Sequence, residues 1–248
     1  RRYKKQIRQV NVDGTRNVCE EALKAGVSKL IHFSSVDAFY RFPIEEPLLE
    51  NRRLIDDPNA VPYDLSKADG QKIVMEFCGK GLDACIIHPT SIVGPNDFKP
   101  GLPMQEMVNL ANGKRKLLPN WGYNFVDVRD LSTTAISAAN NGRTGQNYIV
   151  GGEYHMYSYI AELMKNQLGR TVLLGTIPNF VSYLGLPYEY IKSLATGKPR
   201  VLTVDTLHTG KTGNKVVPST LARKELGHNP RPLEETIHDM VSFFQKRG

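Results

Sequence analysis

The stretch that decides the fold is Lys29-Leu-Ile-His-Phe-Ser-Ser35, followed by Pro62-Tyr-Asp-Leu-Ser-Lys67 and Asp83-Ala-Cys-Ile-Ile-His-Pro89. The first and third pieces are short apolar runs, which are typical of strands buried in a parallel sheet. Pro62 suits the first position of a helix because it has no N–H to leave unpaired. The stretch therefore predicts a strand, a loop, a helix and a second strand, which is the pattern of an α/β fold.

Three polar side chains of this stretch are expected to meet. Tyr63 and Lys67 are four residues apart, so they lie on one face of the predicted helix. Ser35 ends the preceding strand at its carboxyl end, where open α/β sheets bind their ligands. Tyr188 and Lys192 repeat the Tyr-x-x-x-Lys spacing, but no such strand precedes them. Context therefore favours Ser35, Tyr63 and Lys67 as the candidate catalytic residues.

Composition limits the class of protein. The chain has 248 residues, enough for one domain or one and a half, and its net charge is +7. No apolar run approaches the ~20 residues of a membrane span, and the first residues lack the apolar core of a signal peptide. The three cysteines, an odd number without Cys-x-x-Cys spacing, indicate reduced thiols. We therefore expect a cytoplasmic protein without a membrane partner. Basic residues are scattered along the chain, so no nucleic acid partner is expected.

The first part of the chain alternates predicted helices and strands, which favours a parallel sheet. Glycines and prolines mark most of the boundaries, and Asp130 is a candidate N-cap. The expected elements are a helix over 4–25, a strand over 30–35, a loop over 37–60, a helix over 62–78, a strand over 83–89, a helix over 104–111, a strand over 124–128, a helix over 131–140 and a strand over 146–150.

After Gly151-Gly152 the alternation of predicted strands and helices stops, and a smaller, mostly helical region is expected. There we expect a helix capped by Ser158 and ending at Leu168, a strand over 170–174, a helical segment over 178–194, a loop over 197–218 and a helix over 233–245.

Two other segments resemble nucleotide-binding motifs, but neither lies in the sequence context that such a motif requires. Gly79-Lys-Gly81-Leu-Asp-Ala84 resembles a dinucleotide fingerprint, but it follows a helix and precedes a strand, which is the wrong order. Gly210-Lys-Thr212 resembles the end of a P-loop, but Asp205 stands where the opening glycine is required. The histidines are dispersed and the cysteines unpaired, so no metal site is predicted.

Taken together, the residues resemble an extended short-chain dehydrogenase/reductase, the NAD-dependent epimerase/dehydratase group, and within it the dihydroflavonol-reductase-like branch. The resemblance spans residues 10–152 and is loose in the tail. The matching segments are Asn11-Val-Asp-Gly-Thr-Arg-Asn17, His32-Phe-Ser-Ser35, Pro62-Tyr-Asp-Leu-Ser-Lys67-Ala-Asp-Gly70, His88-Pro-Thr-Ser-Ile-Val-Gly-Pro95 and Phe125-Val-Asp-Val-Arg-Asp130.

The resemblance implies a Rossmann-like parallel sheet that is incomplete at its N-terminus, because the family's opening β-α-β unit and its glycine-rich phosphate loop are not in the sequence. Residues 1–152 would form a partial NAD(P)-binding Rossmann domain, with 95–123 contributing to the substrate lobe. Residues 153–248 would form a C-terminal substrate lobe. His88 stands where many relatives carry Arg.

The resemblance also implies roles for the site residues. Tyr63 would donate a proton to a substrate carbonyl, or act as the base in the oxidising direction, and Ser35 would hold the carbonyl oxygen. Lys67, together with a positively charged nicotinamide, would lower the pKa of Tyr63 from about 10, and Lys67 would also bind the nicotinamide ribose. The cofactor would be NAD or NADP. The residues expected to contact it are Ser34, Tyr63, Lys67, Pro89, Thr90, Ser91 and Ile92.

The implied substrate is a small-molecule carbonyl compound or alcohol. Further candidates on the substrate side are Asn96, Phe98, Asn124 and residues 36–40, and Asn11 is expected to have a structural or water-positioning role. Dimers are common in the family, which implies a homodimer that uses the Tyr63 helix.

Three alternatives to a simple reductase stay open. The first is a nucleotide-sugar epimerase, the second a relative that binds NAD(P) without turnover, and the third a truncated product without function. Sugar dehydration is disfavoured, because the dehydratases carry an acidic pair directly after the Ser or Thr, and here Val36 follows Ser35.

Overall fold

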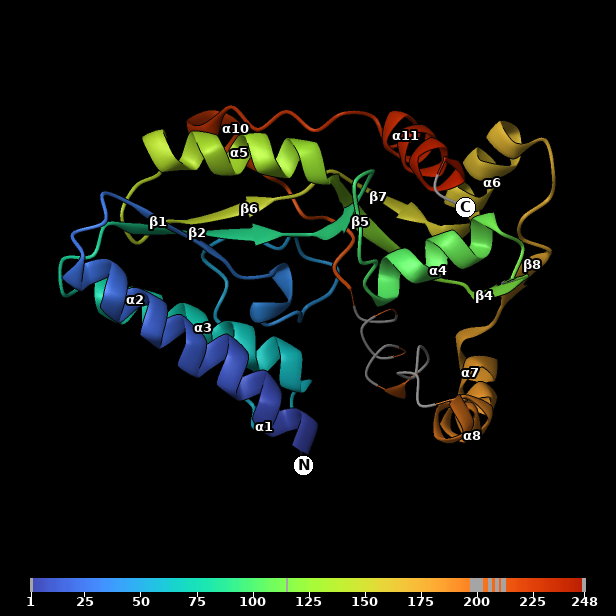
Figure 1. Ribbon diagram of the computed structural model, residues 1–248, viewed down its shortest axis with the longest axis horizontal. Helices are drawn as coiled ribbons and strands as arrows, with labels where there is room; N and C mark the ends of the chain where they lie inside the picture. The colour runs from blue at the N-terminus through green and yellow to red at the C-terminus, as the bar shows by residue number, and fades with distance from the viewer. Residues whose placement is uncertain are drawn as a thin grey trace.

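A parallel sheet forms the centre of the N-terminal part. The structure, a computed structural model, describes residues 2–114, 116–196, 203, 204, 207, 210 and 213–246. Strands β1 (Leu30–Phe33), β2 (Ala84–Pro89) and β6 (Asn147–Val150) lie in the order β1-β2-β6, and all run parallel. Their carboxyl ends therefore meet at one edge of the sheet (Figure 1).

Helices cover both faces of this sheet (Figure 1). On β2, Ala84 and Ile86 pack in one apolar cluster, and Cys85 and Ile87 pack in another. Successive side chains of a strand point to opposite faces, so β2 is buried on both sides and reads as a continuous apolar run. One face carries α1 (Arg2–Arg8), η1 (Gln9–Asp13), α2 (Gly14–Lys24) and α3 (Pro62–Cys78), and the other carries α5 (Val128–Asn141) and α10 (Thr220–Leu226).

A second core lies beyond the carboxyl ends of the sheet. Met107, Phe125, Ile160, Met164 and Ile237 are all buried in one cluster. Its elements are β3 (Ser91–Val93), β4 (Leu117–Pro119), β5 (Gly122–Asp127), β7 (Glu153–Met156) and β8 (Gly175–Ile177), with α4 (Leu102–Ala111), α6 (Tyr157–Leu168) and α11 (Leu233–Gln245). From β8 the chain continues into α7 (Asn179–Ser182), η3 (Tyr183–Gly185) and α8 (Leu186–Thr196), at one end of the molecule (Figure 1).

Most of the predicted elements are confirmed. The helices over 62–78 and 233–245 have the expected bounds, and the strand over 146–150 differs by one residue. The first helix runs without a break from Arg2 to Lys24, but Gln9–Asp13 is wound as a π-helix. The short helix η2 (Val36–Ala38) lies at the start of the expected loop, and residues 178–196 are almost wholly helical.

Three local predictions are wrong. Helix α5 begins at Val128 because Asp127, not Asp130, is its N-cap and accepts the Arg129 N–H at 2.7 Å. Helix α6 begins at Tyr157, so Ser158 is not its cap. Residues 170–174 are not a strand, because pairing with β4 starts only at Gly175.

The expected loop over 197–218, with its Gly210-Lys-Thr212 motif, lies mostly outside the described residues. The division at residue 152 stays a prediction. Helix α10, which it assigns to the second lobe, packs in the core of the central sheet through Ala222 and Leu226. In the part of the chain that the structure describes, no helix combines the length and apolarity needed to cross a membrane. All three cysteines are free thiols.

Candidate active site at the carboxyl end of β1

Ser35 lies directly beyond the last residue of β1. Its backbone is extended, and its hydroxyl caps η2 by accepting the Asp37 N–H at 3.1 Å. The same hydroxyl donates to the Asp37 carboxylate at 3.2 Å, and it lies close enough to the phenol of Tyr63 to affect the pKa of that group. The strand end thus presents a serine hydroxyl beside a tyrosine.

Tyr63 and Lys67 lie on the first turns of α3. The Lys67 Nζ donates to the carbonyl oxygen of Phe33 at 2.9 Å and lies 5.8 Å from the centre of the Tyr63 ring. Tyr63 keeps 42% of its surface exposed, so a ligand can reach it. The structure therefore brings Ser35, Tyr63 and Lys67 together at the carboxyl end of β1. Tyr188 and Lys192 lie on α8, where Lys192 pairs with Glu189.

The π-helical segment η1 fixes the position of α3. Asn11, at the centre of η1, donates to the Ser66 hydroxyl at 2.9 Å, and that hydroxyl donates to the Tyr63 carbonyl oxygen at 2.7 Å. At Gly70 an added Cβ would lie 2.9 Å from the Asn11 carbonyl oxygen, so only glycine permits this approach. Asn11 thus holds the helix that carries Tyr63.

The environment of Tyr63 favours the neutral phenol. Burial raises the pKa of Tyr63 to about 12, the Asp37 carboxylate also acts to raise it, and the neighbouring Ser35 hydroxyl opposes both effects. The Lys67 ammonium lies against the Phe33 carbonyl oxygen, and burial lowers the pKa of Lys67 itself. Its expected effect on the pKa of Tyr63, together with a positively charged nicotinamide, stays a prediction. This environment therefore keeps the Tyr63 hydroxyl protonated near neutral pH.

This protonation state can be measured. We expect Tyr63 to stay neutral as the pH rises past about 10, the usual value for tyrosine, and to ionise only near pH 12, because the raised pKa extends the range of the neutral form upward. The difference in phenolate absorbance between the wild type and Tyr63→Phe reports this ionisation. Added NAD⁺ should lower the midpoint, because a nearby positive charge favours the phenolate. A midpoint below that of free tyrosine without cofactor would contradict the assignment.

A buried charge cluster supports the Ser35 loop. Arg41 donates to Asp37 at 2.9 Å and to Asp64 at 2.7 Å, and the side chains of Arg41 and Asp64 are only 7% and 5% exposed. Asp64 is the neighbour of Tyr63 on α3, so the cluster connects the loop after Ser35 to the Tyr63 helix. Sequence reasoning missed Arg41 and Asp64, which are 23 residues apart.

A second buried polar chain starts at Ser35. The His88 Nδ1 lies 3.0 Å from the Ser35 carbonyl oxygen, and its Nε2 lies 3.1 Å from Asn147 Oδ1, which also accepts from Gln71 at 2.8 Å. Burial lowers the pKa of His88 to about 4, so the ring is neutral near pH 7 and one of its nitrogens must accept. As placed, Gln71 Oε1 has no partner among the described residues. Rotating the side-chain amides of Asn147 and Gln71 by 180° turns the Asn147 NH₂ group towards both His88 Nε2 and the Gln71 oxygen. The Asn147 amide then donates to the histidine, and the Gln71 oxygen gains a donor.

His88 therefore acts as a neutral connector that positions Ser35. We expect His88→Phe, which keeps a ring against Phe39, to lower kcat about tenfold or more, because small displacements of a positioned group are costly. It should also lower the free energy of unfolding by about 1–3 kcal/mol, because buried polar groups lose their partner. Steady-state kinetics and urea unfolding check both, and His88→Gln, which can still donate to Ser35, should recover part of the activity. Equal kcat in all three proteins would remove the positioning role.

The residues predicted to contact a cofactor lie at the same edge. The hydroxyls of Ser34 and Thr90, at the carboxyl ends of β1 and β2, are buried and have no partner among the described residues. Buried hydroxyls without a partner at the carboxyl ends of two strands fit a polar ligand that is bound at this edge of the sheet. Pro89 is buried, Ser91 is half-buried and Ile92 is exposed, and their contacts to a cofactor stay predictions.

Two of the substrate-side candidates have structural contacts. Asn124 is buried and bridges to Gly152, donating to its carbonyl oxygen and accepting its N–H, both at 3.0 Å. Phe98 packs edge-on against Phe243, with ring centres 5.6 Å apart. A substrate role for Asn124 would require this bridge to open.

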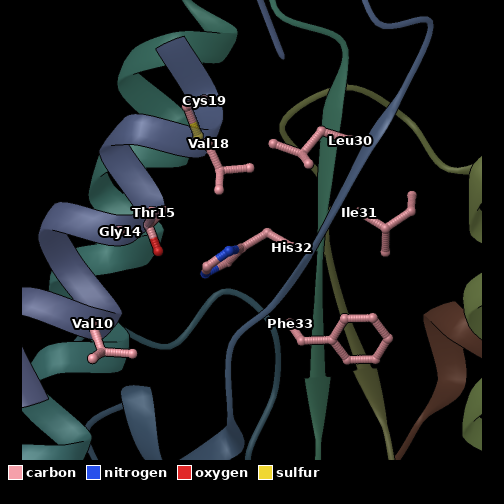
Figure 2. A pocket seen from close by; sticks show the side chains of 9 residues that line it. All are labelled: Val10, Gly14, Thr15, Val18, Cys19, Leu30, Ile31, His32 and Phe33. Atoms are coloured by element: carbon pink, nitrogen blue, oxygen red, sulfur yellow. The ribbon is translucent and has the colours of Figure 1, made fainter. Parts of the chain in front are cut away.

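A cavity of about 310 Å³ lies between α2 and β1, apart from Ser35 and Tyr63. Figure 2 shows His32 pointing from β1 towards Thr15. The His32 Nε2 is buried without a partner among the described residues, and burial lowers the pKa of His32 to about 4. In the described sheet β1 pairs with β2 alone, so its other edge is open to a further strand. The cavity is lined by Val10, Gly14, Thr15, Val18, Cys19, Leu30, Ile31, His32 and Phe33.

Comparison with known proteins identifies the family. The model of the NAD dependent epimerase/dehydratase family matches residues 2–151. The chain belongs to this family. Among curated members, it is 28% identical to sterol demethylase protein B of Methylococcus capsulatus, over 99% of this chain and 75% of that protein. It is 26% identical to a putative dihydroflavonol 4-reductase of Synechocystis, over 96% of this chain and 70% of that protein.

Solved structures agree with this family assignment. The crystal structure of gox2253 superposes with a TM-score of 0.82 at 28% identity, covering 99% of this chain and 74% of that one. A dTDP-glucose 4,6-dehydratase from Bacillus anthracis, determined with NAD, shares the fold at 18% identity, with a TM-score of 0.71 over 96% of this chain and 68% of that one. The predicted Rossmann-like fold is confirmed, and the family's dependence on NAD confirms the predicted class of cofactor.

Proposed function

We propose that this chain interconverts a carbonyl compound and an alcohol by hydride transfer, with NAD or NADP as the hydride carrier. The observation that carries the proposal is the meeting of the Ser35 hydroxyl, the Tyr63 phenol and the Lys67 ammonium at the carboxyl end of β1. A bound nicotinamide supplies or takes the hydride, and the protein supplies position and charge. Ser34, Thr90 and Lys67 have the donors to hold it there, with Pro89, Ser91 and Ile92 beside them.

Each side chain then has one task. Ser35 turns its O–H from Asp37 to the carbonyl oxygen of the substrate, while Asp37 keeps its ion pair with Arg41. Tyr63, as the neutral phenol, donates its proton to the same oxygen as the alcohol forms, and in the reverse direction the phenolate takes that proton back. Lys67 would bind the nicotinamide ribose, and together with a positively charged nicotinamide it would favour the phenolate.

The class of substrate follows from the relatives and from one residue. Sterol demethylase and dihydroflavonol reductase are named for ring compounds of low water solubility, and we propose a small alcohol or ketone of this kind. Epimerisation of a sugar nucleotide remains the second candidate, because the solved relatives include nucleotide-sugar epimerases. Val36 in place of an acid after Ser35 disfavours dehydration.

The test compares cofactor consumption with product formation. The purified protein is incubated with NADPH or NADH and a panel of ring ketones, and both reduced cofactor and alcohol are measured. A second panel of nucleotide sugars is incubated with NAD⁺ or NADP⁺. The proposal predicts one cofactor oxidised for each alcohol formed on the first panel. Isomerised nucleotide sugar with no net change in the cofactor would instead indicate an epimerase, and cofactor binding without turnover on either panel would indicate a non-catalytic relative. The homodimer and the cytoplasmic location stay predictions.

A further inference from the structure

The helical segment α7–η3–α8 buries polar side chains and exposes apolar ones. Ser182 and Glu189 are buried, at 3% and 4% exposed, whereas large apolar and aromatic side chains of the same segment face outward. A helix on a soluble protein normally has the opposite arrangement, with its apolar stripe against the core. The outward residues, each 44–79% exposed, are Phe180, Tyr183, Leu184, Tyr188, Tyr190, Ile191 and Leu194.

These residues form one face, called here the outer face of α7–α8. Phe180, Leu184, Tyr188 and Ile191 follow one another at intervals of four, four and three residues, which is helical spacing. Contiguous exposed apolar surface of this kind marks an interaction site, whereas single exposed apolar residues need no explanation.

Charge indicates the kind of partner. Between Pro178 and Thr196 the sequence has one acid, Glu189, and one base, Lys192. Glu189 is buried and pairs with Lys192 at 3.2 Å, so this segment has no exposed carboxylate that would repel an anionic surface. The whole chain carries a net charge of +7. Two copies of a chain with this charge repel each other, whereas anionic lipid headgroups attract it.

Residue types favour the same partner. Three of the seven outward residues are tyrosines, whose rings have an apolar body and a polar tip suited to the boundary between lipid and water. The segment lies at one end of the molecule, where it can meet a flat surface (Figure 1). With 18 residues in three short pieces, it can lie on a bilayer but not cross it.

We propose that the outer face of α7–α8 docks on the surface of an anionic lipid bilayer. The site would then take its poorly soluble substrate from that surface, a consequence that rests on the proposed function. This departs from the expectation of no membrane partner, which came from the lack of a spanning run. A search for continuous apolar runs cannot detect this face, because its apolar residues are spaced along a helix and are separated by other residues.

Flotation of the full-length chain with lipid vesicles tests the proposal. We expect binding to vesicles of phosphatidylcholine with phosphatidylserine, and weaker binding to phosphatidylcholine alone or at high salt. Ile191→Glu should reduce the bound fraction about tenfold or more, because an isoleucine that would insert into the bilayer surface is exchanged for a charge that the anionic lipids repel. Adding Leu184→Glu should abolish it.

Ile136→Glu is the matched control. Ile136 on α5 is 69% exposed and Ile191 is 65% exposed, so both variants make the same change of side chain and charge at similar exposure. The proposal predicts that Ile136→Glu floats almost as the wild type does. Equal loss in both variants, or no flotation of the wild type, would overturn it. So would a wild-type dimer that Ile191→Glu converts to a monomer in light scattering without any vesicle binding, because a second copy would then cover the face.

The proposed function is followed separately in the same preparations by titration with NADPH and with NADH, using the fluorescence of the reduced cofactor. Ile191→Glu should bind the reduced cofactor as the wild type does, which also shows that the variant is folded. If the wild type floats with vesicles but binds neither NADPH nor NADH, docking is supported and the proposed function is contradicted. If it binds a reduced cofactor but does not float, docking is contradicted and the proposed function stands.

Discussion

Tyr63→Phe is expected to lower kcat for carbonyl reduction by about 10²–10⁴-fold, the usual contribution of a positioned proton donor. The variant keeps the ring beside Lys67 and removes only the phenolic O–H. KM should change little, because the lost interaction acts on the oxygen as it gains charge and hardly at all in the ground state. Steady-state kinetics on the best ketone of the panel provide the measurement.

Tyr159→Phe is the control for this result. Tyr159 lies on α6 and its phenol donates to Glu234, within the second core, so removing it should leave kcat near the wild-type value. Turnover that is equal in the wild type and in both variants would show that Tyr63 is not the proton donor.

Arg41→Met is expected to lower the free energy of unfolding by about 3–5 kcal/mol, which is the usual cost of removing one partner of a buried ion pair. Methionine fills part of the volume but leaves the Asp64 carboxylate, 5% exposed, without its guanidinium at 2.7 Å. Activity should fall as well, because Asp37 loses its pairing at 2.9 Å and is then free to hold the Ser35 hydroxyl more strongly.

Urea unfolding followed by circular dichroism measures this loss, with Arg16→Met as the control. Arg16 also pairs with a carboxylate, Glu76 at 3.1 Å, but both side chains are 42% exposed. Exposed pairs contribute little because water screens them, so this variant should be close to the wild type in stability. Similar losses in Arg41→Met and Arg16→Met would mean that the buried cluster is not a special support of the loop.

Much of the fold follows from local signals. Pro62 and the glycines after Cys78 set the bounds of α3, and the buried strand β2 reads as an uninterrupted apolar run. The errors occur where two neighbours compete for one role. Asp127 and Asp130 both suit an N-cap, and the structure uses Asp127 because Asp130 accepts the Arg231 backbone N–H at 2.8 Å. The two residues of that contact are 101 positions apart, so the residues around Asp130 do not predict it.

The candidate site was predictable in part for the same reason. Ser35, Tyr63 and Lys67 sit at positions that strand and helix periodicity define, so their meeting could be expected. Arg41 and Asp64, and the chain from His88 through Asn147 to Gln71, join residues that only the tertiary fold brings together. The contacts of Asn11 in η1 likewise depend on which side of a helix is buried, and so does the outer face of α7–α8. Periodicity alone does not decide which side that is.

The most direct test of the account follows hydride from cofactor to product. With NADPH deuterated at the transferring position, the alcohol made by the wild type should carry one deuterium on its carbinol carbon, seen by mass spectrometry, and Tyr63→Phe should make the same labelled product far more slowly. Product without deuterium, or labelled product formed at an unchanged rate by Tyr63→Phe, would contradict the claim that Ser35, Tyr63 and Lys67 reduce a carbonyl beside a bound nicotinamide.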